Sequence, residues 1–307
     1  MAFDGILVHA LTAELNSVLR DTRLVKIQEP SPEELLLSFK SRETEARLLL
    51  SASASLPFFC LTETKKESPA EAPAFLMLLR KHLSNARFLR AVQPGLERVL
   101  FLDFEHLDEM GDLRTVRLVS EVMGKYSNLI LVSEDGTILD AIRRVSPLMS
   151  SVRSVLPGKP YFIPETQGKT DPLTETKEDF LRRLDPERTA LQNLADHYQG
   201  MSAASVSEWL LDCGIHPDAH NESEALWDAF SRLCETLREE RFTPLMVMKD
   251  DKPEGFFVLP VHSYPEEAGY TSKLFRSPSA LVDLWYCDKN RTDVLKEDRK
   301  ELLKAVR

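Results

Sequence analysis

The chain has 307 residues, of which 43% are hydrophobic and 29% are charged, and its formal net charge at pH 7 is −10. This length and hydrophobic content suffice for a buried core and for two or more domains, which excludes an intrinsically disordered protein. The acidic balance excludes indiscriminate binding to nucleic acid, because binding to phosphate groups needs local positive charge.

Positive charge is concentrated in two stretches of the chain. Residues 76–100 contain five basic residues and one acidic residue, and residues 141–160 contain four basic residues and no acidic one. Residues 198–240 are strongly acidic by contrast. The pattern favours one basic and one acidic end of the molecule, although ordinary solvated faces also give such charge runs. The basic side chains concerned are Arg80, Lys81, Arg87, Arg90, Arg98, Arg143, Arg144, Arg153 and Lys159.

The first predicted elements are a helix and a hairpin. Apolar residues recur at helical spacing between Ile6 and Leu19, and Asp4 is placed to cap the first turn of this helix. Two short apolar segments, residues 35–39 and 46–50, lie on either side of a polar turn. This arrangement predicts a β-hairpin.

A second helix and two further hairpins follow. The apolar run of residues 74–82 has the length and composition of a buried helix. Residues 97–105 are expected to pair with 113–122, and residues 128–132 with 138–142. An Asp-Gly pair in the second of these turns is a strong hairpin signal. Together these elements predict an α+β domain with an antiparallel sheet.

The next region has a helical pattern, with helices expected at residues 180–184, 191–198, 206–211 and 226–237. Gly200 lies in a tight turn between the second and third of these helices, and Ser202 is expected to cap the third. This is the form of a helix-hairpin-helix, whose turn and helix N-terminus can bind a phosphate. A glycine-containing connection between packed helices explains the same pattern without RNA.

The last part of the chain predicts a hairpin and a long helix. Residues 245–248 and 256–261 flank a polar turn and are expected to form a hairpin that returns to the sheet domain. Residues 290–307 are charge-rich, with leucines at a spacing compatible with a coiled coil. The predicted boundaries are 1–168 for the sheet domain, 169–240 for the helical domain, 241–275 for the returning hairpin and 276–307 for the start of the coiled coil.

The sequence contains no recognisable catalytic motif. Walker A, GxGxxG, HExxH and GxSxG patterns are absent. Cys213, His216 and His220 have a spacing seen in metal sites, but no CxxC pair accompanies them and we interpret them as structural. Asp103 and Glu105 alternate with apolar residues on a predicted strand and are expected to face solvent. The sequence therefore predicts a protein that is not an enzyme, with no cofactor, metal or small-molecule substrate.

Several features indicate a cytoplasmic protein. The first residues show neither a basic region nor a cleavage site of a secretory signal. No apolar run approaches the roughly 20 residues that a membrane-spanning helix needs, so no membrane partner is expected. The four cysteines are scattered without a CxxC pair, as is typical of free thiols in a reducing compartment.

Five segments of the chain carry a resemblance to a known family. They are FDG at residues 3–5, LLRKHL at 78–83, GLERVLFLDF at 95–104, EVMGKYSNLILV at 121–132 and VLPGKPY at 155–161. In this order they resemble the N-terminal region of the NFACT family of ribosome quality-control factors, whose members are also named fibronectin-binding proteins. The combination is specific, although each segment alone would be a weak signal.

The resemblance implies a fold. Family members have an N-terminal domain similar to that of Fpg/MutM DNA glycosylases, then a helix-hairpin-helix, a coiled coil and a C-terminal domain. Those glycosylases attack with an N-terminal proline amine, whereas this chain begins Met1-Ala2-Phe3. A glycosylase activity is therefore not implied by the similarity of fold.

The resemblance also implies a function. Such proteins bind large ribosomal subunits obstructed by peptidyl-tRNA and recruit tRNA, typically tRNA for alanine, for untemplated C-terminal tailing of the stalled chain. The family's Asp-Arg pair for tRNA binding reads Glu97-Arg98 here, and its Glu-Ile-Met reads Glu121-Val122-Met123. The alternatives are a fibronectin-binding surface adhesin and a DNA-repair protein similar to the glycosylases. The remaining residues predicted to bind the ribosome or RNA are Arg80, Lys81, Lys125 and Gly200.

Overall fold

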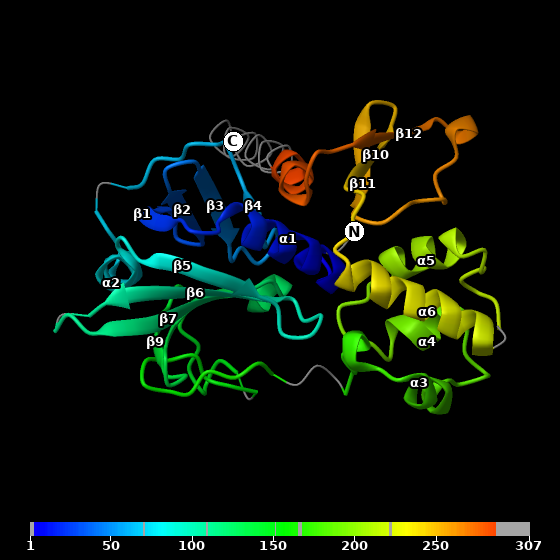
Figure 1. Ribbon diagram of the computed structural model, residues 1–307, viewed down its shortest axis with the longest axis horizontal. Coiled ribbons are helices and arrows are strands. Elements are labelled where there is room, and N and C mark those ends of the chain that lie inside the picture. The colour runs from blue at the N-terminus through cyan, green and yellow to red at the C-terminus, as the bar shows by residue number, and fades with distance from the viewer. Residues whose placement is uncertain are drawn as a thin grey trace, which may run out of the picture.

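The computed structural model describes residues 3–69, 71–108, 110–150, 152–164, 168–220 and 223–286. Helix α1 (Gly5–Val18) lies at the centre of the molecule, between a large sheet and a group of helices (Figure 1). The Asp4 carboxylate caps it by accepting a hydrogen bond of 2.9 Å from the Leu7 N–H, which confirms the predicted helix start. Leu7, Leu11 and Leu15 are buried, so the helix forms part of the core.

Within the described residues, nine antiparallel strands form one sheet in the order β4-β3-β2-β1-β5-β6-β7-β8-β9. The hairpins β2–β3, β6–β7 and β8–β9 are those predicted, and the α+β class with an antiparallel sheet is confirmed. The sequence did not predict β1, β4 and β5. The strands are β1 (Arg23–Ser31), β2 (Glu34–Lys40), β3 (Glu45–Ser51), β4 (Phe58–Leu61), β5 (Arg87–Val92), β6 (Val99–Leu107), β7 (Leu113–Glu121), β8 (Asn128–Ser133) and β9 (Ile138–Ala141).

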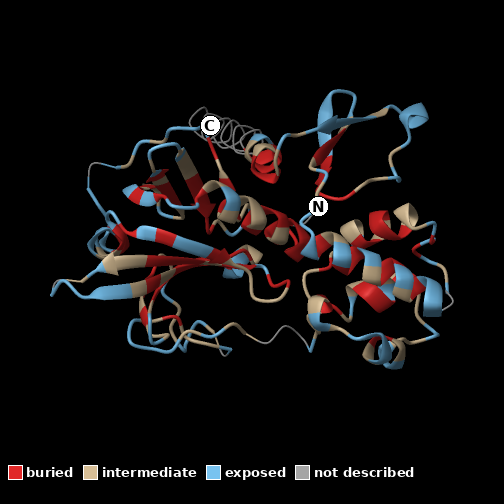
Figure 2. Ribbon diagram, viewed as in Figure 1, coloured by how far each residue is buried: buried red, intermediate tan, exposed pale blue. Residues whose placement is uncertain are grey.

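The core of this half lies between the sheet and its helices. Helix α2 (Ala74–Leu83), which was predicted, packs against β1, β6 and β9. Phe39 of β2 stacks on Phe104 of β6 with their ring centroids 6.2 Å apart. Large aromatic side chains of this kind bury much apolar surface. Figure 2 shows the buried residues along the inner sides of both halves of the molecule.

The helical half follows the sheet in the chain and confirms the predicted helical pattern. It contains α3 (Lys177–Arg183), α4 (Ala190–Ala195), α5 (Ala203–Asp212) and α6 (Ser223–Arg238). Phe180, Tyr198 and Phe230 form its aromatic core, with the Tyr198 and Phe230 ring centroids 4.6 Å apart. Ser202 caps α5 as predicted. The assignment as a helix-hairpin-helix domain stays a prediction.

The last described elements form a small separate sheet. Strands β10 (Leu245–Lys249) and β11 (Lys252–Phe257) make the predicted hairpin, but β12 (Tyr270–Leu274) pairs with β10 and none of the three joins the large sheet. The predicted return to the sheet domain stays a prediction, since Met246 and Phe256 belong to the same hydrophobic core as residues of the large sheet. The small sheet packs through Phe256 against Trp285, in a helix of residues 278–286. The coiled coil predicted for residues 290–307 lies outside the described residues.

Candidate nucleic-acid interface

The two stretches that the family resemblance assigned to RNA lie side by side. Val99 at the start of β6 pairs with Glu121 at the end of β7. Beyond this pair, the Val122 N–H donates a hydrogen bond of 2.9 Å to the carbonyl oxygen of Arg98. Residues 97–98 and 121–123 therefore lie together at the start of β6 and the end of β7, although more than twenty residues separate them in the chain. We call this end of the two strands, with the residues up to Tyr126, the edge.

The two side chains of the Glu97-Arg98 pair face different surroundings. Both residues precede β6 rather than begin it. Arg98 is exposed and, among the described residues, makes no side-chain hydrogen bond or ion pair. Glu97 is only 8% exposed and borders a recess of about 510 Å³ between the sheet and the helices. Lys169, Asp171 and Gln199 line the same recess, and no motif in the sequence pointed to them because they belong to the helical half.

Gly200 lies against this edge for a packing reason. Its φ is +68°, and a Cβ at this position would lie 2.1 Å from the carbonyl oxygen of Leu96. Its own carbonyl accepts a hydrogen bond of 2.9 Å from the Gly5 N–H. The two halves of the molecule thus meet backbone to backbone, which only a glycine permits. This packing accounts for the glycine without RNA, and the RNA contact predicted for Gly200 stays a prediction.

The Asp4 carboxylate occupies the start of α5, where the sequence predicted that a phosphate could bind. The Ser202 and Ser205 hydroxyls donate hydrogen bonds of 2.6 and 2.5 Å to the Asp4 carboxylate. Asp4 is 5% exposed, and burial raises the pKa of its carboxyl although these hydrogen bonds act in the opposite direction. The predicted phosphate-binding turn is thus part of the contact between the two halves of the molecule.

Glu121 and Val122 are buried and do not present a surface to RNA, which corrects the prediction of direct contact. Glu121 is fully buried and forms an ion pair with Arg153. Its carboxylate also accepts a hydrogen bond of 2.9 Å from the Tyr161 hydroxyl. Burial and the nearby carboxylate raise the pKa of Tyr161 far above its usual range, so the phenol remains a donor. This network fixes the end of β7.

The residues after this strand end are the exposed part of the edge. Lys125 and Tyr126 lie in a short 3-10 turn (Gly124–Tyr126), and the Lys125 ammonium is 5.0 Å from the centre of the Tyr126 ring. Tyr126 is 68% exposed, whereas Met123 is partly buried. The sequence prediction did not include Tyr126, although an aromatic residue beside a lysine is a usual signal for nucleic-acid contact. Arg98, Lys125 and Tyr126 are the side chains that this edge offers to a partner.

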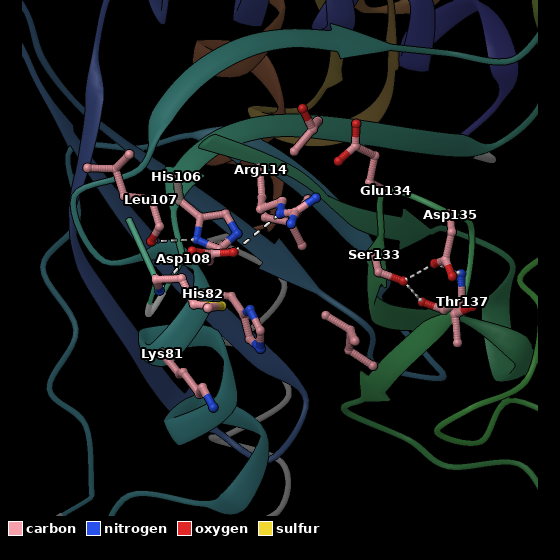
Figure 3. Close-up of a pocket in the computed structure, with 14 residues that line it drawn as sticks. Lys81, His82, His106, Leu107, Asp108, Arg114, Ser133, Glu134, Asp135 and Thr137 are labelled. Atoms are coloured by element: carbon pink, nitrogen blue, oxygen red, sulfur yellow. Dashed lines mark hydrogen bonds and ion pairs between the residues drawn. The ribbon is translucent and has the colours of Figure 1, made fainter. Parts of the chain in front are cut away.

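Arg80 and Lys81 do not belong to this edge. They lie on α2, and Lys81 borders a cavity of about 1060 Å³ at the opposite end of β6, roughly 27 Å of strand away. Figure 3 shows Lys81 and His82 on one side of this cavity and Ser133, Asp135 and Thr137 on the other. Arg80 donates a hydrogen bond of 3.2 Å to the carbonyl oxygen of Ile27. The predicted site residues therefore divide between two places.

Most arginines of the two basic stretches are paired with acids from other parts of the chain. The pairs are Arg87–Glu105, Arg90–Asp103, Arg143–Glu33, Arg144–Asp140 and Arg153–Glu121. The prediction that Asp103 faces solvent is wrong, because it is 3% exposed and bound by Arg90 and Arg117. Burial acts to raise the pKa of Asp103, but the two guanidinium groups together hold it below its usual range.

The described residues form neither a metal-ion cluster nor a helix that could cross a membrane. No three His, Cys, Asp or Glu side chains there lie close enough together to hold a metal ion, and this includes the region of Cys213. None of the described helices is long and apolar enough to cross a membrane.

Curated relatives align with most or all of the chain. It is 32% identical over 308 residues to the Rqc2 homolog RqcH of Bacillus subtilis (strain 168), covering 100% of this chain and 52% of that protein. The Rqc2 homolog RqcH of Streptococcus suis is 31% identical over 307 residues, with the same coverage. The archaeal Rqc2 homolog aRqcH of Methanocaldococcus jannaschii is 25% identical over 281 residues, which are 89% of this chain and 40% of that protein. The chain thus spans about half the length of the curated relatives it matches.

Solved structures of similar fold and a family model also match nearly the whole chain. The N-terminal part of the fibronectin/fibrinogen-binding protein from Streptococcus suis superimposes with a TM-score of 0.78 at 29% identity, covering 94% of this chain and 100% of that one. The fibrinogen binding protein from Staphylococcus aureus gives a TM-score of 0.78 at 26% identity, covering 93% and 99%. Residues 4–307 match the model of the NFACT N-terminal and middle domains, and the chain therefore belongs to the NFACT family.

Proposed function

We propose that this chain is the RNA-binding half of a cytoplasmic ribosome quality-control factor. In this proposal the protein binds large ribosomal subunits obstructed by peptidyl-tRNA and recruits tRNA, specifically tRNA for alanine, for untemplated tailing of the stalled chain. The relatives named Rqc2 homolog RqcH support this role. The protein positions RNA and does not catalyse, since peptidyl transfer is the chemistry of the ribosome.

The observation that carries the proposal is the hydrogen bond between Val122 and Arg98, which joins both predicted RNA stretches at one edge. The exposed Arg98 guanidinium can hold a phosphate or stack on an unpaired base, and the Lys125 ammonium can bind a second phosphate. Glu97, which lines the neighbouring recess, can accept hydrogen bonds from the amino group of a base that enters it. Such a combination suits a single-stranded tRNA segment.

Sedimentation tests the proposal. The full-length protein is mixed with large subunits that carry peptidyl-tRNA, and in parallel with empty large subunits, and each mixture is separated on a sucrose gradient at low salt. We expect the protein to co-sediment preferentially with the obstructed subunits. A protein that stays at the top of both gradients would contradict the ribosomal role.

The second candidate function is binding to fibronectin, because solved relatives carry that name. Surface plasmon resonance on immobilised fibronectin distinguishes the two functions. Saturable binding to fibronectin, without co-sedimentation with large subunits, would favour the adhesin.

A further inference from the structure

The outer face of β1, β2 and β3 carries a row of polar and basic side chains. The register pairs Lys26 with Ser38, and Ser38 with Arg47. Residues paired across antiparallel strands project to the same face of a sheet, so these three side chains form one row across about 10 Å of sheet. The next row contains Lys40, which pairs with Arg23 on one side and with Glu45 on the other.

The loop that follows β4 covers one side of this face and turns it into a groove. Gln28 of β1 donates a hydrogen bond of 2.8 Å to the carbonyl oxygen of Lys66, and the Lys66 ammonium pairs with Glu34 at 2.8 Å. Lys65, next to it in the loop, is exposed at the rim. The enclosed groove has a volume of about 580 Å³.

The groove is positively charged in a protein whose net charge is −10. Five basic side chains line it against two carboxylates. Arg47 pairs with Glu45 at 3.1 Å and Lys66 with Glu34, which lies outside the lining, so the charges of these two basic residues are already balanced. The second lining carboxylate is the exposed Glu67. Lys26, Lys40 and Lys65 are exposed and form no ion pair with any part of the chain that the structure describes. Three ammonium groups are therefore available to an anionic ligand.

We propose that this groove binds the sugar–phosphate backbone of single-stranded RNA, an inference that rests on the proposed function. Lysine is a point charge that suits phosphate, and the Ser38 hydroxyl adds a hydrogen-bonding group without base selectivity. The aromatic ring on this part of the sheet, Phe39, is fully buried, so bases are not stacked here. The groove is thus a sequence-independent contact, separate from the edge at Arg98.

The strands beneath the groove favour RNA over an acidic peptide. The central strand of the groove, β2, is paired along its length with β1 on one side and β3 on the other, so its backbone N–H and C=O groups are already used. β1 pairs with β5 only at Arg23 and also packs against helix α2. An extended peptide that binds to a sheet depends on a free strand edge for its main-chain hydrogen bonds. The sugar–phosphate backbone of RNA needs only the ammonium groups, and the groove offers these.

The test compares two triple variants of the 307-residue chain with the same change in net charge. The groove variant carries Lys26→Glu, Lys40→Glu and Lys65→Glu. The control carries Lys249→Glu, Lys252→Glu and Lys273→Glu, three exposed lysines of the small sheet. Fluorescence anisotropy measures the affinity for a labelled oligouridylate over a range of salt concentrations, and circular dichroism checks that both variants are folded.

We expect the groove variant to lose RNA affinity by on the order of a hundredfold, and the slope of its log affinity against log salt concentration to become shallower by about 2. The RNA affinity of the control should change by less than about threefold. Equal losses in the two variants, or an unchanged salt slope in the groove variant, overturn the groove assignment. So does a polyglutamate peptide that binds the wild-type chain as tightly as oligouridylate.

The groove and the ribosomal role can fail separately. If the groove variant keeps its RNA affinity while the full-length protein still sediments with obstructed subunits, only the groove assignment is wrong. If the wild-type chain binds oligouridylate through the groove but the full-length protein stays at the top of the gradient, the groove stands and the ribosomal function does not.

Discussion

The Asp4 carboxylate accepts a hydrogen bond of 2.6 Å from the Ser202 hydroxyl, which joins the first residues of the chain to a helix 198 residues later. The same carboxylate caps α1 through the Leu7 N–H and accepts a further hydrogen bond from Ser205 at the start of α5. Two helix N-termini therefore share one buried carboxyl group as their hydrogen-bond acceptor. This contact fixes the helical half against the edge that carries Glu97 and Arg98.

Removing the shared carboxylate should destabilise the protein strongly. Asp4→Ala deletes the cap of α1 and leaves two partly buried hydroxyls without their acceptor, so we expect the free energy of unfolding to fall by about 2–4 kcal/mol. Ser205→Ala, which removes only one donor, should cost about 1 kcal/mol. Urea unfolding followed by circular dichroism measures both. Identical midpoints for Asp4→Ala and the wild type would mean that this contact contributes nothing.

A side chain at Gly200 should affect folding rather than RNA affinity. In Gly200→Ala the added Cβ would lie 2.1 Å from the Leu96 carbonyl oxygen, and the alanine would have to keep the positive φ of the glycine. We expect these two effects together to lower the free energy of unfolding by about 2–4 kcal/mol. The matched control is Gly214→Ala, because Gly214 also has a positive φ, of +75°, but nothing lies within 4 Å of the added Cβ. We expect the control to cost only about 1 kcal/mol. A weaker RNA affinity per folded molecule in Gly200→Ala alone would show that this turn belongs to the RNA-binding site.

Substitutions of Glu121 and Lys125 should have different effects, the first on the stability of the fold and the second on RNA binding. Glu121→Ala leaves the Arg153 guanidinium buried without its partner, and we expect a loss of about 3–5 kcal/mol in the free energy of unfolding. Lys125→Ala, at an exposed position, should change stability by less than about 0.5 kcal/mol and weaken RNA binding. Thermal unfolding and tRNA binding are measured on both variants. A stable Glu121→Ala protein that has lost only tRNA affinity would show that Glu121 contacts RNA after all.

Ionisation of Glu29 should make the stability of the fold depend on pH. It is 4% exposed, its Oε2 atom has no hydrogen-bond partner among the described residues, and burial raises the pKa of its carboxyl above the ordinary 4.5. Because the folded state binds the proton more tightly than the unfolded state, this residue lowers stability as pH rises from 4.5 through the folded pKa.

We therefore expect Glu29→Gln, which cannot ionise, to melt at a higher temperature than the wild type at neutral pH. The difference should shrink as the pH approaches 4.5, where the wild-type carboxyl is protonated in the folded state. Calorimetry of both proteins across this range provides the measurement. A difference that is independent of pH would assign the effect to packing instead of ionisation.

The local signals in the sequence predicted the hairpins and helices, because each is defined by a turn or by a period within a short window. Strand β5 was missed since its neighbour β1 lies far away in the chain and its partner β6 follows a loop without a hairpin turn signal. Asp103 was misjudged for a related reason. Its two arginines come from the strands on either side, and the register that brings them there is not visible in one strand.

The candidate edge was predictable only in part. The resemblance pointed to Glu97, Arg98 and residues 121–123, but their adjacency depends on the pairing of β6 with β7. The burial of Glu121 depends on Arg153, which lies in a loop 32 residues later. The lysines of the groove were missed because they come from separate segments, none of which is basic by itself.

Sequencing and quantification of the tRNA that co-purifies with the full-length protein test RNA recruitment at this edge most directly. The variants are Arg98→Ala and the double variant Glu97→Ala with Arg98→Ala, and the control is Arg241→Ala, an exposed arginine outside the edge. We predict that both edge variants fold, still sediment with obstructed large subunits and lose bound tRNA and tailing activity, while the control retains both. Normal amounts of tRNA on the folded double variant would contradict the assignment.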